Sequence, residues 1–220
     1  MKPGLLICFI LASATAIAGC RRVIVEPSNG SIVPTGVEPT LLLRYSQRST
    51  VIFDDTSVQR DSILRATYCL TLSHFGEPGF EAFADSVDTE AVWFIWLRSF
   101  NNPIAVRMMR RGASYALTGI EMDGVPELRP GKLVFRDSTA IDVDTWRSLT
   151  APLRRTQFWN TTALPMYGLD GATWTVAASS NGRVYVTKRW SPEANGDDAL
   201  VRAFGLAILR AAKLDRGPIY

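Results

Sequence analysis

The sequence predicts an α+β domain in which a largely antiparallel sheet packs against a C-terminal helix and a short helix. Short runs rich in β-branched and aromatic residues follow one another with tight connections, which is typical of an antiparallel meander. One run, residues 91–97, is apolar on both faces, so we expect it at the centre of the sheet. From residue 197 onwards, apolar residues recur at helical spacing, which predicts the C-terminal helix.

Further strands are expected on both sides of the central run. Asn101-Asn102-Pro103 provides a turn after it, and Asn181-Gly182 predicts a hairpin because both residues tolerate positive φ. The remaining predicted strands are residues 23–25, 41–45, 49–53, 104–109, 114–122, 132–136, 173–178 and 183–189.

Two helices complete the prediction. The short helix spans residues 144–150, with Asp142 or Asp144 as its N-cap and an end near Pro152. The C-terminal helix opens at Asp197-Asp198 and has cations in its last turn, so the charges at both ends oppose the helix dipole favourably. Those cations are Arg210 and Lys213, and the apolar face comprises Leu200, Val201, Phe204, Ile208 and Ala211.

The first nineteen residues have the order of an export signal. Lys2 is followed by an apolar run, residues 5–11, and then by small residues. The apolar run is shorter than the roughly 20 residues that a membrane-spanning helix needs. We therefore expect residues 1–19 to be a signal peptide that is removed.

The segment Ile17-Ala18-Gly19-Cys20 resembles the bacterial lipobox. The resemblance implies that the Cys20 thiol receives a diacylglyceryl group, that the signal is cut before it, and that a fatty acyl chain such as palmitate is added to the new amine. An ordinary secretory signal with a chance cysteine is the alternative. The expected organisation is a signal peptide at 1–19, a lipidated N-terminus and tether at 20–40, rich in Pro and Gly, and one globular α+β domain at 41–220.

The net charge and the small number of cysteines and histidines exclude several classes of partner and site. Removal of Lys2 with the signal leaves 23 Lys and Arg against 21 Asp and Glu, which argues against nucleic acid as a partner. Cys69 is then the only cysteine besides the lipidated one, so we expect no intrachain disulfide and a buried Cys69. One histidine and one cysteine cannot form a structural zinc site, and we expect no metal and no cofactor.

The last 80 residues carry a set of aromatic and glycine motifs: Phe158-Trp159, Gly168-Leu169-Asp170-Gly171-Ala172-Thr173-Trp174, Tyr185 and Arg189-Trp190-Ser191-Pro192. They resemble the FW, GLDGxxW and RWSP motifs of an uncharacterised family of exported bacterial proteins. The resemblance implies kinship with that family but no mechanism.

Two interpretations of these motifs remain open. In the first, Trp159, Asp170, Trp174, Arg189 and Trp190 line a cleft, because aromatic faces beside a few polar groups are typical of sugar and peptide sites. In the second, the aspartate forms an Asx-type turn and the tryptophans fill the interface between the sheet and the C-terminal helix, with the arginine stacked on one of them.

No recognisable catalytic set is present, and we assign no catalytic residue. His74 is the only histidine, and the chain has no Gly-x-Ser-x-Gly elbow and no Ser-x-x-Lys motif beside which it could act as a base. The strand end Arg110-Arg111 either touches anionic headgroups or is an ordinary polar strand end. A carboxylate pair for glycoside hydrolysis could be drawn from five acidic residues, which otherwise fit a solvated loop or helix: Glu77, Glu81, Asp85, Asp88 and Glu90.

These observations predict a membrane-anchored periplasmic lipoprotein that binds an envelope protein or an envelope polymer and is not an enzyme. Membrane lipid is its partner through acylated Cys20, and Arg21, in place of an aspartate, favours the outer over the inner membrane. The alternatives are an envelope hydrolase that acts on glycan or peptide through Asp170 or the 77–90 carboxylates, and a structural accessory without a ligand.

Overall fold

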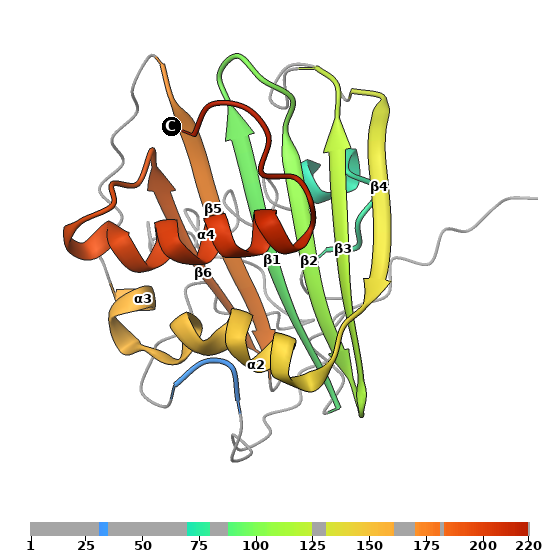
Figure 1. Cartoon of the computed structure of the whole chain (residues 1–220), viewed down its shortest axis with the longest axis vertical. Helices are drawn as coiled ribbons and strands as arrows, with labels where there is room; N and C mark the ends of the chain where they lie inside the picture. The colour runs from blue at the N-terminus through green and yellow to red at the C-terminus, as the bar shows by residue number, and fades with distance from the viewer. Residues whose placement is uncertain are drawn as a thin grey trace, which may run out of the picture.

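The computed structural model describes residues 31–34, 70–79, 88–124, 131–160, 170–180 and 183–219. Six antiparallel strands form one sheet in the order β4-β3-β2-β1-β5-β6. A layer of helices crosses one face of this sheet (Figure 1). The α+β class, with a largely antiparallel sheet against a C-terminal and a short helix, is therefore confirmed. The strands are β1 Thr89–Arg98, β2 Ile104–Arg111, β3 Ser114–Met122, β4 Leu133–Ala140, β5 Ala172–Ser180 and β6 Arg183–Trp190.

The helices of this layer lie between β4 and β5 and after β6. They are α2 Val143–Thr150, the 3-10 turn η2 Ala151–Arg154, α3 Thr156–Asn160, the 3-10 turn η3 Gly196–Asp198 and α4 Ala199–Ala211. Asp142 is the N-cap of α2, because its carboxylate accepts a hydrogen bond from the Thr145 N–H at 2.6 Å. Among the described residues, no helix has the length and apolar character needed to cross a membrane.

β1 occupies the centre of the sheet, between β2 and β5, as its apolar sequence predicts. Alternate side chains point to opposite faces of a strand, and both sets are buried here. Phe94 and Trp96 belong to the core beneath the helices, while Trp93 and Ile95 belong to a second core on the opposite face.

Aromatic side chains fill the core between the sheet and the helices. Trp174 on β5 lies 5.3 Å from Phe94 between ring centroids, and Phe204 on α4 lies 6.5 Å from Phe94. Gly205 lets α4 approach the sheet, since a Cβ at this position would meet the Trp174 ring at 2.3 Å. The C-terminal helix therefore packs directly on β1 and β5.

A helical turn at residues 70–74 packs on the second face of the sheet. Leu72 and Phe75 insert into the second core, which also contains Trp93 and Ile120. Both cores are therefore built from alternate residues of the same strands.

Residues 31–34 pack into the core beneath the helices, although they fall inside the range expected to be tether. Ile32 is fully buried and Val33 is 4% exposed. Arg154 of η2 donates a hydrogen bond to the Ser31 carbonyl at 2.6 Å, which places this segment beside the α2–η2 helices (Figure 1). The folded unit thus begins no later than Ser31.

The elements differ from the prediction in several places. β4 continues to Ala140 rather than ending at residue 136. Residues 137–140 are polar or small and exposed, but they pair with residues 116–119 of β3 and so extend the strand. Lys213 lies beyond α4 with φ +59°, so of the two predicted cations only Arg210 is in the last turn. The helical residues 70–74, η2 and α3 were not predicted. The predicted strands 23–25, 41–45 and 49–53, together with Cys69 and Asn181-Gly182, lie outside the described residues.

Candidate functional site

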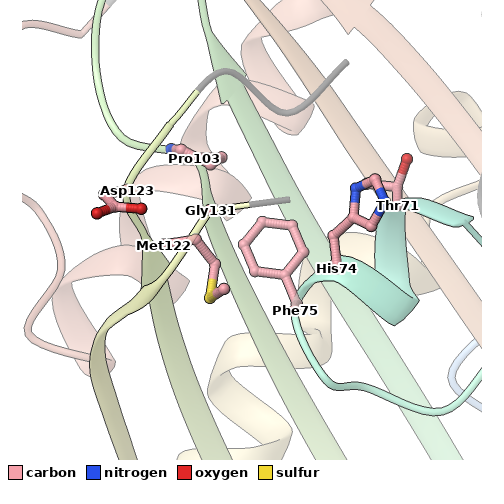
Figure 2. Close-up of a pocket in the computed structure, with 7 residues that line it drawn as sticks. All are labelled: Thr71, His74, Phe75, Pro103, Met122, Asp123 and Gly131. Carbon is pink, nitrogen blue, oxygen red and sulfur yellow. The ribbon is translucent and has the colours of Figure 1, made fainter. Parts of the chain in front are cut away.

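A small pocket lies on the second face of the sheet, between the helical residues 70–74 and the β2–β3 side of the sheet (Figure 2). Its free volume, about 10 Å³, corresponds to a single water molecule. The pocket is lined by Thr71, His74, Phe75, Pro103, Met122, Asp123 and Gly131. Figure 2 shows Phe75 and Met122 between Asp123 on one side and His74 on the other.

His74 is half-buried, and its Nδ1 atom is buried without a hydrogen-bond partner among the residues that the structure describes. An imidazole that acts as a base needs a nucleophile within hydrogen-bond reach and a second group that orients it. The pocket lining contributes one hydroxyl, from Thr71, and one carboxylate, from Asp123, which accepts the Lys132 N–H. Figure 2 places that carboxylate on the far side of the Phe75 ring from the imidazole.

Trp159 and Trp174 are core residues. Trp174 is fully buried and packs against Trp96 at 5.5 Å between centroids. Trp159 is 7% exposed, lies 6.0 Å from Tyr185, and donates its Nε1–H to the Leu153 carbonyl at 2.7 Å. Their rings therefore face protein neighbours rather than an open cleft.

The other three predicted binding residues surround the ends of β5 and β6 but do not share a face. Arg189 is paired across the strands with Trp174, is 7% exposed, and forms an ion pair with Asp198 at 3.0 Å. Trp190 follows it in the strand, so its half-buried side chain points to the opposite face. Asp170 is exposed in the bend before β5. The Arg202 guanidinium lies over the Trp174 ring, 5.9 Å from its centroid.

The glycine and serine of the motifs form a hydrogen-bonded junction between three strands. Gly171 has φ +154° and donates its N–H to the Ser99 hydroxyl, while its carbonyl accepts the Ser99 N–H. The Ser191 hydroxyl accepts the Ala172 N–H at 3.0 Å, and the Ser191 N–H bonds the Ala172 carbonyl at 2.8 Å. A Cβ at Gly171 would lie 2.4 Å from the Ser191 Oγ, so the junction has no room for a side chain.

Glu77 connects the segment 70–79 to the sheet through two arginines. Its Oε2 lies 2.6 Å from Arg107 Nη1 on β2, and its Oε1 lies 2.6 Å from Arg136 Nη2 on β4. Arg136 also donates to the Phe75 carbonyl. Burial raises the pKa of Glu77 above its ordinary value, although the two guanidinium groups act in the opposite direction. This carboxylate therefore has a structural partner on each oxygen.

Glu90 forms a second buried cluster, on the helix face of β1. Its Oε2 accepts from Arg110 Nε at 3.0 Å, and its Oε1 accepts from the Ser180 hydroxyl at 2.9 Å. The same Oε1 accepts the Ile32 N–H at 3.2 Å, and the Ser31 hydroxyl lies 3.1 Å from that of Ser180. The cluster therefore fixes the N-terminal segment to the ends of β1, β2 and β5.

Several sequence predictions concern parts of these clusters. Of the five acidic residues, Glu77 and Glu90 are buried in separate ion pairs, Asp88 is exposed, and Glu81 and Asp85 lie outside the described residues. Arg110 forms an ion pair with Glu90, and Arg111 is exposed at the strand end.

Cys20 and Arg21 also lie outside the described residues. Within the described ranges, no three His, Cys, Asp or Glu side chains are grouped so that they could hold a metal ion.

The two ion-pair clusters differ in how far the sequence could have revealed them. The β1–β2 turn sets a register centred on Phe100, so counting outward from Phe100 finds Glu90 opposite Arg110. Counting outward from Asn102, the middle of the predicted turn, would place Glu90 opposite Ser114 instead. No sequence spacing links Glu77 to Arg107 and Arg136, which lie 30 and 59 residues later. Comparison of the chain with protein-family models, curated proteins and solved structures gives no significant match.

Proposed function

We propose that the protein is a lipoprotein of the bacterial cell envelope, anchored by acyl chains on Cys20, whose folded domain faces the periplasm and binds an envelope protein or polymer. The observation that carries the proposal is the docking of Ser31 and Ile32 into the domain, eleven residues after Cys20. A chain of eleven residues spans at most about 36–40 Å when fully extended. The domain would therefore stay close to the membrane that holds the acyl chains.

Two features of the described residues support binding across an outer surface. The pocket beside His74 has room for one water and not for a sugar or a peptide side chain. Apolar side chains are exposed elsewhere, at Phe100 in the β1–β2 turn and at Leu133 and Val134 at the start of β4, with exposed fractions of 70%, 55% and 54%. Contiguous apolar patches mark contacts with partner molecules, so we propose that these three residues contribute to such a patch.

The anchor is tested by growth of the native host with an alkyne analogue of palmitate, followed by mass spectrometry of the purified protein and by membrane fractionation. We expect a mature N-terminus at Cys20 that carries acyl chains, and recovery with the outer membrane. The Cys20→Ala variant is the matched control and should lose both label and membrane association. An uncut N-terminus or an unmodified Cys20 in the native protein would contradict the proposal.

The binding role needs a separate experiment. Crosslinking in intact cells, followed by isolation of the protein, should recover the same envelope component from the anchored protein in repeated preparations, and much less of it from Cys20→Ala. Substitution of Phe100 by Ser, at the exposed turn, tests whether this surface takes part. Failure of the anchored protein to enrich any component over a matched lipoprotein of the same host would count against a binding role.

A further inference from the structure

The docked segment determines which end of the domain is nearest to the lipid anchor. Ser31 is bonded to Ser180, the last residue of β5, and to Arg154, the last residue of η2. Glu90, at the beginning of β1, accepts the next backbone N–H. Phe100 lies beyond the opposite end of β1, ten residues or about 30 Å further along the strand direction. The end with α2 and η2 therefore adjoins the point where the chain leaves for Cys20 (Figure 1).

The outward side of these helices carries three exposed arginines. Arg147, Ala151 and Arg154 follow one another at intervals of about one helical turn, and Arg155 comes next. All four residues are exposed, while Trp146 and Leu153 on the inward side are buried in the core. We define the exposed residues Arg147, Arg154 and Arg155 as the arginine face.

Within the described helices α2 and η2, the acidic residues lie at the far end of this face. Asp144 is 3.3 Å from Arg147, and Asp142 caps the helix. Ten residues separate Asp144 from Arg154, which is about 15 Å along a helix axis. At physiological ionic strength the Debye length is about 8 Å, so these carboxylates offset Arg147 but act weakly on Arg154 and Arg155.

We propose that the arginine face rests on anionic phospholipid headgroups at the membrane surface to which the domain is anchored. This inference depends on the proposed acylation of Cys20. Eleven residues span at most about 36–40 Å when fully extended, so the anchor keeps the adjoining arginines within that distance of the headgroups. Each arginine near an anionic surface raises the ratio of contacting to detached orientations about fivefold.

The test uses the acylated protein, reconstituted into vesicles of phosphatidylcholine with or without phosphatidylglycerol. A donor fluorophore is placed at Gln157→Cys, beside the arginine face, or at Phe100→Cys, both in a Cys69→Ser background, and the acceptor is a headgroup-labelled lipid. We expect more energy transfer at position 157 than at position 100, and an increase at position 157 when phosphatidylglycerol is present. High salt should remove that increase.

Charge substitutions identify the face responsible. In Arg147→Gln/Arg155→Gln most of the increase should be lost, while Arg154 is kept because it bonds Ser31. Arg210→Gln/Lys213→Gln removes two exposed cations at the end of α4 and should keep the increase. Thermal unfolding shows whether each variant is folded.

The outcomes separate the two proposals. Acylated protein that gives equal transfer with both lipids, or an Arg147→Gln/Arg155→Gln variant that behaves like the unsubstituted protein, overturns the arginine face and leaves the anchor standing. A bare Cys20 in the native protein overturns both, and mass spectrometry shows it before any vesicle is made.

Discussion

The backbone N–H of Ile32 donates a hydrogen bond of 3.2 Å to Oε1 of Glu90, a carboxylate 58 residues later in the chain. Ile32 is fully buried, and Glu90 is 5% exposed. Arg110 neutralises the carboxylate from the neighbouring strand. The hydrogen bond thus holds the N-terminal segment at a site that is already buried and paired, which makes this segment part of the domain's core.

The first prediction concerns chains that begin on either side of this segment. A mature chain that begins at residue 31 keeps the whole described segment and is the reference. A chain that begins at residue 35 loses the buried side chains of Ile32 and Val33 and leaves Glu90 without one donor. We expect it to lose at least about 3 kcal/mol of unfolding free energy. Equal stability of the chains that begin at 31 and 35 would show that the segment does not support the core.

This segment also shows where sequence reasoning stops. Proline and glycine around residues 27–39 favour a tether, and local composition contains no sign that Ile32 and Val33 fill a gap beneath helices more than 100 residues away. The strands were predicted well because a run such as residues 91–97 carries its own burial pattern, and the β1–β2 turn fixes the register of its neighbours. Local patterns report local structure, while the docking depends on contacts that form only after the sheet is assembled.

In the candidate site, too, the sequence indicates local pairing but not the long-range contacts that bury it. The motif residues Trp174 and Arg189 do come together, because they are opposite each other in adjacent strands, and hairpin register can be read from sequence. Whether their side chains face solvent depends on η3 and α4, because Gly205 of α4 lies against the Trp174 ring and Asp198 of η3 forms an ion pair with Arg189. The predicted hairpin was enough to derive this pairing, although it was not stated, and the sequence left open whether the pair lines a cleft.

The second prediction concerns the contact between α4 and β5. Gly205→Ala would gain helix propensity, but the new Cβ would lie 2.3 Å from Trp174 and 2.9 Å from Phe94, both fully buried. We expect a net loss of about 1–3 kcal/mol, because crowding in a packed core exceeds the propensity gain of about 1 kcal/mol. Urea unfolding measures this loss.

A double-mutant cycle with Trp174→Phe identifies the cause of the loss. The smaller ring should recover part of the cost of Gly205→Ala, so the two changes together should cost less than their sum. Additive effects would mean that the alanine acts elsewhere.

The third prediction compares two glycines with positive φ. Gly196 has φ +59°, and apart from its chain neighbours no described residue has a heavy atom within 4 Å of the position that an added methyl group would take. Gly171 has φ +154°, with the Ser191 Oγ 2.4 Å from that position. Gly196→Ala should cost about 1 kcal/mol of unfolding free energy, from backbone strain alone. Gly171→Ala should cost about 1–3 kcal/mol more, because the junction of β1, β5 and β6 must open to admit the methyl group. Similar losses for both variants would mean that the motif glycine is needed only for its backbone conformation.

The last prediction follows from the raised pKa of Glu77. Burial favours the protonated carboxyl in the folded state, so above the ordinary value of 4.5 the folded protein binds more protons than the unfolded chain. The unfolding free energy should therefore fall as pH rises from about 4.5 through the raised pKa, by at most about 1.4 kcal/mol per pH unit. Glu77→Gln cannot ionise, so the stability of the unsubstituted protein relative to this variant should decline over the same window in urea titrations.

Asp142→Asn is the opposite control. The Thr145 N–H lowers the pKa of Asp142 below 3.8, so the stability that the ionised Asp142 contributes is lost only as pH falls below that value. If the Glu77 difference instead grows with pH, Arg107 and Arg136 outweigh burial, and the carboxylate is a net stabilising partner for both arginines.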